Sequence, residues 1–415
     1  MKIVRVFSRI LIGCLFIFSG FVKGVDPQGF AIKLSEYMLS FGLPEWETLM
    51  LIFSIAVSSA EMLIGICLFI GLRINITAWA ALIFMSFFTL LTFYSAIANP
   101  VSDCGCFGDA IVLTNWQTFF KNLVLIIPTI VVFWQRKSYN SMFKPAIEWG
   151  LIAAYAFAGV SVFTYCYKHL PIIDFRPYHV GADIKAGMTI PEGAVMDEYK
   201  TLFYYKKDGV IKEFTEENYP WSDSSWTWVE TKPILIKKGY TPPIHDFSIS
   251  SNDGEDITDS VLTNSGYSLL LISSDISKAN VEGFVKASKI AKEAIRSDIG
   301  FYSLTSSSAD VAASLKKKVK YDFTFYATDQ TTLKTIIRSN PGLVLLKEGI
   351  VIGQWHYNDF PEPGFFSGNL LSKQINSLRK NEDSKMGFLF IALFLLSVSI
   401  LYVIRVNCNQ KGERL

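Results

Sequence analysis

The sequence predicts a membrane helical bundle that is joined to an exported α+β region. Half of the 415 residues are hydrophobic and only 18% are charged, whereas a typical soluble protein carries about 25% charged residues. The charge is missing from a few long stretches and is ordinary elsewhere, which is typical of membrane spans. Between residues 168 and 385 charge returns, and short strand-like and helix-like runs alternate with turn residues.

A spanning helix needs about 20 mostly apolar residues. The first predicted span is the shortest apolar run, but the long side chains of Arg9 and Lys23 at its two ends can extend to the membrane surface. A cleaved signal peptide is the alternative for this span, although no Ala-x-Ala site follows it. The predicted spans are residues 5–25, 49–71, 76–98, 118–135, 146–168 and 386–406.

The basic residues of the loops predict the orientation, because loops rich in Lys and Arg stay in the cytoplasm. With six spans, every basic loop falls on one side of the membrane. Both termini are then cytoplasmic, and residues 168–385 are periplasmic, as expected for a multi-pass protein of a bacterial inner membrane. The residues concerned are Lys2, Arg5, Arg9, Arg73, Arg136, Lys137, Lys144, Arg405, Lys411 and Arg414.

The exported part divides into two segments. Residues 169–241 are β-rich and aromatic, with a hairpin turn predicted at 207–209. Residues 242–362 alternate strand and helix patterns, which predicts a sheet with helices on its faces. The net charge of +2 gives no indication of nucleic-acid binding.

The string DCGCFGDA, between the third and fourth spans, holds the most specific chemistry in the chain. A disulfide between Cys104 and Cys106 would close a small ring, and such a bond is relatively oxidising. Three other interpretations remain open: a structural disulfide, two unrelated thiols, and a metal site, although no other Cys or His lies near in sequence and no metal is predicted. The carboxylates of Asp103 and Asp109 argue against a very reactive thiolate.

Four further residues in or beside the spans are candidates for function. Cys166 lies at the outer end of the fifth span and is a candidate third thiol, or a small packing residue. Glu61 lies inside the second span, where a carboxylate is costly. It is a candidate for carrying a proton or binding a quinone, or else a hydrogen-bonded packing residue near Tyr94 or Asn99. Lys23 and Lys121 are candidate cofactor-binding residues, or anchors at helix ends.

The segments PPIHDFSI, YSLLLIS and SNPGLVLLKEGIVIGQW resemble the thioredoxin fold, especially its membrane-tethered members. The resemblance covers about 120 residues, and Pro341 occupies the position of the family's cis proline. It implies that Asn340 and Pro341 present backbone groups to an extended partner. The family's Cys-x-x-Cys is missing after YSLLLIS. Because disulfide exchange proceeds through a thiolate, this cysteine-free domain is expected to bind a partner and not to exchange disulfides.

The first 140 residues resemble the DoxX family. RILIGCLFIFSGFVKGVDP is similar to its first helix and SSAEMLIGICLFIGL to its second, while DCGCFGDA and NWQTFFKNLVL resemble the MauE branch, which includes methylamine-utilisation accessory proteins. The combination with a cysteine-free thioredoxin-like domain looks like a Bacteroidetes-type family. The resemblance implies a four-helix bundle and a redox-associated function, linked to disulfide formation in exported partners or to quinone-coupled oxidation.

The leading hypothesis is therefore a membrane protein of thiol–disulfide exchange on exported partners. Cys104 and Cys106 would form the redox pair, and a quinone near Glu61 is the candidate cofactor. The alternative is a non-enzymatic envelope scaffold, in which the Cys pair is structural and the thioredoxin-like domain binds a partner protein.

Overall fold

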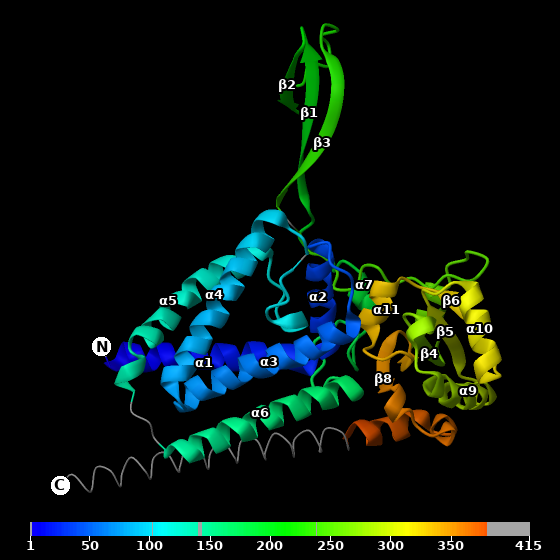
Figure 1. Ribbon diagram of the computed structural model, residues 1–415. Coiled ribbons are helices and arrows are strands. Elements are labelled where there is room, and N and C mark those ends of the chain that lie inside the picture. The colour runs from blue at the N-terminus through cyan, green and yellow to red at the C-terminus, as the bar shows by residue number, and fades with distance from the viewer. Residues whose placement is uncertain (1, 102, 140–142, 238, 380–415) are drawn as a thin grey trace.

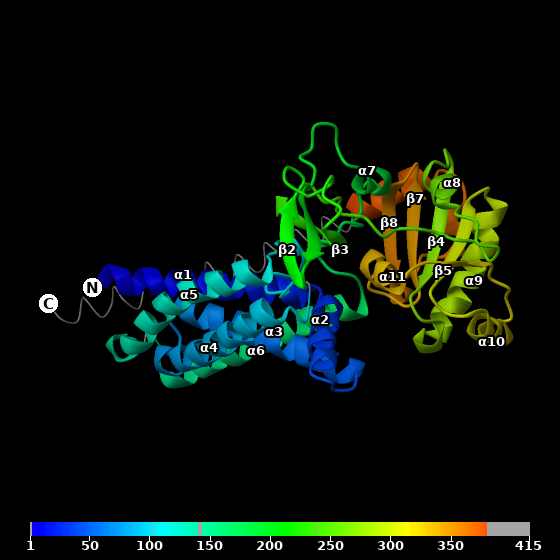
Figure 2. The same ribbon diagram turned by 90° about the horizontal axis from the view of Figure 1, so that it is seen from above.

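The protein is described by a computed structural model (Figure 1), which covers residues 2–101, 103–139, 143–237 and 239–379. Long helices form a bundle, and a separate α/β domain lies beyond one end of it. A narrow three-stranded sheet projects sideways from the region between them (Figures 1 and 2). The sixth predicted span, 386–406, lies outside the described residues.

Within the described residues, five helices are long and apolar enough to cross a membrane. Their outward side chains include Leu90 and Phe157, which are 70% and 76% exposed, as expected for groups that contact lipid tails. The chain is therefore a multi-pass membrane protein, and the predicted fold class is confirmed. The helices are α1 (Lys2–Val25), α3 (Glu47–Ile70), α4 (Ile74–Ala98), α5 (Asn115–Trp134) and α6 (Pro145–Lys168).

Small residues let α1 and α3 pack with their backbones close together. A Cβ atom on Gly20 would lie 2.5 Å from the backbone nitrogen of Met62, and one on Gly65 would lie 2.5 Å from that of Ile17. Close backbone approach through small residues is a common way for helices to associate in membranes. Any larger side chain at Gly20 or Gly65 would push the two helices apart.

A helix that the sequence analysis did not predict, α2 (Pro27–Ser40), occupies most of the expected 26–48 loop. Asp26 is its N-cap and accepts a hydrogen bond from the Gly29 N–H at 2.9 Å, and Pro27 opens its first turn, which is a common helix start. The helix is too short to span a membrane. It lies at the end of the bundle that faces the α/β domain (Figures 1 and 2), which we call the domain end.

The projecting sheet has three antiparallel strands in the order β2-β1-β3. Its hairpin turn is at Asp208 and Gly209, both with positive φ angles, as the sequence indicates. Strand β3 is exposed along its whole length. The strands are β1 (Glu198–Lys207), β2 (Val210–Thr215) and β3 (Thr227–Lys237), and a short helix, α7 (Ile184–Met188), precedes them.

The α/β domain has a five-stranded sheet in the order β6-β5-β4-β7-β8. Strands β4, β5 and β6 are parallel, whereas β7 and β8 are antiparallel to their neighbours. The peptide bond between Asn340 and Pro341, just before β7, is cis. This topology is thioredoxin-like, as expected. The strands are β4 (Tyr267–Ser273), β5 (Gly300–Thr305), β6 (Phe325–Ala327), β7 (Gly342–Lys347) and β8 (Ile350–His356).

Helices cover both faces of this sheet. Because neighbouring strand residues point to opposite faces, Leu269 and Leu271 pack with α9 and α10, whereas Leu270 and Ile272 pack with α8 and α11. The helices are α8 (Thr258–Leu262), α9 (Val281–Arg296), α10 (Ala309–Val319) and α11 (Gln330–Ile336). Short 3₁₀ turns are η1 (Gly108–Ala110), η2 (Arg136–Ser138), η3 (Ile276–Lys278), η4 (Tyr357–Asp359) and η5 (Pro363–Phe366).

Candidate functional site

The two sequence-predicted thiols lie in the segment that joins α4 to α5, at the domain end of the bundle. Gly105 between them has a φ angle of 62°, a conformation that glycine adopts without steric cost. Both cysteines are free thiols in this structure. The tight bend allows the two side chains to have different surroundings, although only one residue separates them.

Cys104 is covered by α2. The Tyr37 hydroxyl lies 3.2 Å from the Cys104 sulfur and 3.0 Å from the Ser95 hydroxyl. Tyr37 and Cys104 pack in one small apolar cluster, and Cys104 is only 7% exposed. Burial and the neighbouring Cys104 raise the pKa of Tyr37, so the phenol stays protonated and can donate to the sulfur.

Cys106 faces the inside of the bundle. It lines a cavity of about 40 Å³ together with Lys23, Glu61 and Lys121. The Ser19 hydroxyl donates to the Cys106 carbonyl at 2.8 Å and fixes the loop above this cavity. The structure thus brings Cys106 and the three charged residues singled out from the sequence to one place.

The two thiols differ in acidity. A hydrogen bond from Cys104, with help from Lys121 and Lys23 against the opposing effect of burial, lowers the pKa of Cys106 to about 6. The same hydrogen bond to Cys106, together with burial, raises the pKa of Cys104. Cys106 is therefore the more acidic of the two sulfurs and Cys104 the thiol that donates to it, an asymmetry typical of reactive cysteine pairs.

The charge inside the bundle is paired. Glu61 forms an ion pair with Lys23, and both side chains are buried. The Lys23 ammonium also lies 5.3 Å from the centres of the Phe30 and Phe88 rings. Lys23 is therefore the ion-pair partner of a buried carboxylate, and not a residue that reaches out to the membrane surface.

The suggestion that Glu61 packs near Tyr94 or Asn99 is wrong. The ring of Tyr94 packs against Phe41, and the Asn99 side chain accepts a hydrogen bond from Asn115 at 2.8 Å. Lys121 shares the Glu61 cavity, and its ammonium lies 4.0 Å from the centre of the Phe107 ring, which immediately follows Cys106.

The two carboxylates that flank the cysteines have basic partners, so they do not oppose a thiolate as the sequence suggested. The Asp103 carboxylate lies 2.9 Å from the ammonium of Lys33 on α2. Asp109, in η1, lies 3.7 Å from the guanidinium of Arg338 in the α/β domain. The charges that act on the pKa of Cys106 are those of the cavity, where Lys121 and Lys23 lower it and Glu61 raises it.

The third candidate thiol, Cys166, is buried on α6. It belongs neither to the residues that line the Cys106 cavity nor to the apolar cluster around Cys104. In the described part of the chain, the structure therefore does not bring Cys166 together with the pair. A role for Cys166 in exchange stays a prediction.

Asn340 ties two loops of the α/β domain together. Its side-chain oxygen accepts a hydrogen bond from Ser273 at 2.7 Å, and its amide donates to the Asp275 carbonyl at 2.7 Å. Its backbone carbonyl accepts from the Asn280 N–H at 2.9 Å, and the Pro341 carbonyl accepts from Ser339 at 2.6 Å. Both backbone groups thus have partners within the domain, and binding of an extended partner there stays a prediction.

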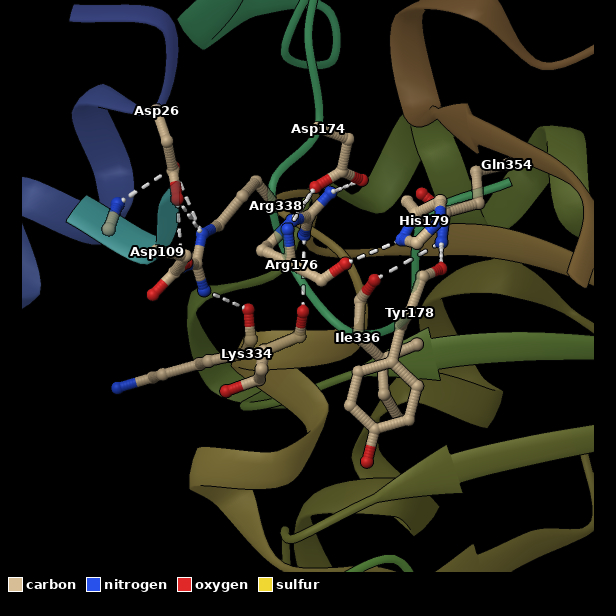
Figure 3. A network of polar contacts seen from close by, with 12 residues as sticks. Asp26, Asp109, Asp174, Arg176, Tyr178, His179, Lys334, Ile336, Arg338 and Gln354 are labelled. Carbon is tan, nitrogen blue, oxygen red and sulfur yellow. Dashed lines mark hydrogen bonds and ion pairs between the residues drawn. The ribbon is translucent and has the colours of Figure 1, made fainter. Parts of the chain in front are cut away.

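An ion-pair network that the sequence analysis missed joins the domain to the bundle (Figure 3). The Arg338 Nε lies 3.0 and 2.9 Å from the two carboxylate oxygens of Asp26, and its Nη2 lies 2.8 Å from one of them. Burial opposes the ionised form of Asp26, but Arg338 outweighs it and lowers the pKa of this carboxyl. Behind it, Arg176 binds Asp174 through two nitrogens at 2.7 and 2.6 Å. Local sequence gives no signal for a pair 312 residues apart.

Two family models match separate parts of the chain. Residues 1–135 match the family model described as methylamine utilisation protein MauE, and residues 199–238 match a domain of unknown function, DUF8463, which coincides with the projecting sheet. A curated relative, Protein TlpB of Flavobacterium psychrophilum, is 30% identical over 137 residues. That match spans 32% of this chain and 37% of the relative's length.

Among solved structures, the chain is similar to the solution structure of a putative protein disulfide isomerase from Bacteroides thetaiotaomicron. The sequences are 14% identical, the likeness covers 34% of this chain and 85% of that one, and the TM-score is 0.23. The segment that matches MauE contains α1 to α5 and both loop cysteines. It is therefore the cysteine-bearing bundle, and not the thioredoxin-like domain, that is similar to MauE.

Proposed function

We propose that this membrane protein forms disulfides in exported partner proteins through Cys104 and Cys106. One observation carries the proposal: Cys106, with a pKa of about 6, shares a cavity with Lys23, Glu61 and Lys121, while Cys104 lies beside Tyr37 at the domain end. A structural disulfide has no need of a lowered pKa, and structural cysteines are usually inert.

The exchange would run from the partner protein to Cys104. A partner thiolate attacks the Cys104 sulfur of the Cys104–Cys106 disulfide, the bond between the two protein sulfurs breaks, and Cys106 leaves as a thiolate. The less basic sulfur is the better leaving group, and Lys121 and Lys23 stabilise its charge. A second partner thiolate then displaces Cys104. The partner gains a disulfide, and its two electrons reside on the Cys pair. Cys104, the more basic sulfur, takes up a proton when it leaves, whereas Cys106 is released as the thiolate.

The Lys23–Glu61 pair is the proposed proton-handling group. It borders the cavity into which the Cys106 thiolate is released. A cavity of about 40 Å³ is large enough for water, and a water molecule there could relay a proton between Glu61 and the sulfur. An intramembrane carboxylate is commonly retained for such a role.

A quinone is the proposed electron acceptor, and only part of the site suits it. Lys23 and Lys121 would suit the ring's carbonyl oxygens, and Phe84 and Phe88 its flat faces. The space of about 40 Å³ is smaller than a quinone ring, so the lining side chains would have to move. When bound, a quinone would accept the two electrons of the Cys pair together with two protons, one from Cys104 and one through the cavity.

The domain end of the bundle is proposed to face the periplasm. The loop charges described above support this orientation, and an oxidising compartment is where such exchange serves a purpose.

The 242–362 domain has no cysteine, so its proposed role is to bind the partner near Asn340 and Pro341.

The second candidate function is an envelope scaffold. The observation that favours it is the fixed docking of the domain on the bundle through Arg338. In that case the Cys pair would take no part in exchange, and no partner would become attached to it.

A trapping experiment distinguishes the two functions. In cells that carry Cys106→Ser, Cys104 can still attack the disulfide of an oxidised partner, the reverse of the second step above, and release one partner thiolate. Because Cys104 then has no resolving thiol, the mixed disulfide should accumulate and disappear on reduction. Cys104→Ser is the matched control, because Cys106 faces the cavity and should trap little. If neither variant forms a mixed disulfide in growing cells, the exchange function is excluded and the scaffold remains.

A further inference from the structure

The reactive pair poses a problem of access, because Cys104 is only 7% exposed. Two side chains of α2, one helical turn apart, cover the cysteine loop. Tyr37 contacts the Cys104 sulfur, and the carbons of Lys33 pass so close to Gly105 that a Cβ atom there would lie 3.3 Å away. A protein thiol can therefore reach Cys104 only if α2 moves.

The first end of α2 is held by the α/β domain. Arg338 binds both carboxylate oxygens of Asp26, the N-cap of the helix, and its Nη2 also faces Asp109 after the cysteines. The Arg338 and Asp26 side chains are only 10% and 19% exposed. A charge-assisted, bidentate ion pair of this kind is among the stronger polar interactions in proteins.

The segment after α2 is held by the same domain at a second point. Lys278, in η3, contacts Glu47, the first residue of α3, at 2.5 Å. Both side chains are about half exposed, and exposed ion pairs contribute little to stability. The domain therefore contacts the chain at both ends of α2, strongly at Asp26 and weakly at Glu47. Figures 1 and 2 show α2 between the bundle and the domain.

We propose that α2 is a lid over Cys104 and that Arg338 is the positioning residue through which the soluble domain holds this lid closed. Arg338 acts through Asp26 and touches no reacting atom. The purpose of the lid, to regulate access to Cys104, rests on the proposed exchange function. The burial of Cys104 under α2 does not depend on any redox role.

The test measures how fast Cys104 reacts with a membrane-impermeant maleimide. The full-length protein is reduced in membranes, labelled, and digested, and the peptide containing Cys104 is quantified by mass spectrometry. Arg338→Ala should raise the labelling rate about tenfold. Asp26→Asn should do the same, because asparagine still caps a helix but cannot form the ion pair. Arg338→Lys keeps the charge but cannot form the bidentate contact, so its labelling rate should lie between those of Arg338→Ala and the native protein.

Two further variants separate a lid from general loosening. The double variant Arg338→Ala/Asp26→Asn should label no faster than either single variant, because both changes remove the same contact. Lys278→Ala, the matched control at the exposed contact, should change the rate less than twofold. An unchanged rate in both Arg338→Ala and Asp26→Asn overturns the lid. So does an additive effect in the double variant, or an equal effect of Lys278→Ala.

The outcome is distinguishable from failure of the exchange function. Labelling is done on chemically reduced protein and requires no partner, so a negative result removes the lid and leaves the trapping experiment unaffected. Conversely, a cell that shows no mixed disulfide does not alter the labelling rates.

Discussion

The bundle and the α/β domain divide between them what a single thioredoxin-like domain usually combines. The bundle holds the two loop cysteines and a buried ion pair, Lys23–Glu61, but offers a partner protein no open route to Cys104. The domain has the thioredoxin-like sheet and a cis proline, but no cysteine between residues 168 and 385. Under the proposed function, this difference assigns reactivity to the bundle and positioning to the domain.

If that division is right, changes in one region should alter one property and leave the other intact. Changes in the bundle should affect thiol chemistry, whereas changes in the domain should affect its own stability and its docking.

The largest effect should come from breaking the ion pair of the bundle. Lys23→Met leaves Glu61 buried without its partner, which typically costs about 3–5 kcal/mol. The melting temperature of the detergent-solubilised protein should fall markedly. Lys23→Met/Glu61→Met removes both charges and should recover most of the stability while losing exchange activity. A double variant as unstable as the single one would contradict the ion pair as the reason.

The second prediction concerns pH. Because the pKa of Cys106 is lowered to about 6, its alkylation rate should rise through a midpoint near pH 6 and level off above it, whereas an ordinary thiol titrates near 8.5. At pH 6, this amounts to on the order of 100-fold more thiolate. Cys104, whose pKa is raised, should react slowly across the same range.

Lys121→Met sharpens this prediction. Lys121 contributes to the lowered pKa of Cys106, so its removal should move the midpoint upward. Lys212→Met, in the projecting sheet, is the matched control and should leave the midpoint unchanged. A midpoint unaffected by Lys121→Met would show that this ammonium does not stabilise the thiolate.

The third prediction tests the domain alone. Asn340→Ala removes two hydrogen bonds that join the cis-proline loop to Ser273 and Asp275. It leaves the buried Ser273 hydroxyl without this acceptor, whereas the Asp275 carbonyl still accepts from the Lys278 N–H. A loss of about 2 kcal/mol in the stability of the domain is expected, measurable by hydrogen exchange in β4 and β7. The pH profile of Cys106 should not change, and a shifted profile would contradict the division between the two regions.

The smallest effect is expected at Tyr37. Tyr37→Phe keeps the ring that packs over Cys104 but removes the hydroxyl between Cys104 and Ser95. One neutral hydrogen bond contributes about 1 kcal/mol. Maleimide labelling of Cys104 should rise less than in Arg338→Ala. A larger rise than in that variant would mean that the hydroxyl, and not the domain, holds α2 in place.

Much of the bundle could be predicted from the sequence because a membrane-spanning helix needs a long, continuous apolar segment. Apolar length alone indicates the helices, so α4 (Ile74–Ala98) largely coincides with the predicted span 76–98. The Cys-Gly-Cys string is equally local. By contrast, α2 is short and carries polar residues between two spans, so hydropathy does not detect it, although the Asp26-Pro27 start was a readable signal.

The parts of the site that the sequence did not predict are contacts between segments far apart in the chain. Lys23 lies at a helix end in sequence, which suggests an anchor, and only the packing of α1 on α3 turns it toward Glu61. Arg338 meets Asp26 only after the domain docks. No periodicity or spacing encodes either contact, because each depends on how distant segments fold against one another.

The most direct test of the central claim is the redox state of Cys104 and Cys106 in intact cells, scored by acid quenching and differential alkylation. The account predicts that the pair is mainly a disulfide in aerated cells and shifts toward the dithiol when export of thiol-rich proteins increases. A pair that keeps one state under every growth condition would contradict a role in exchange.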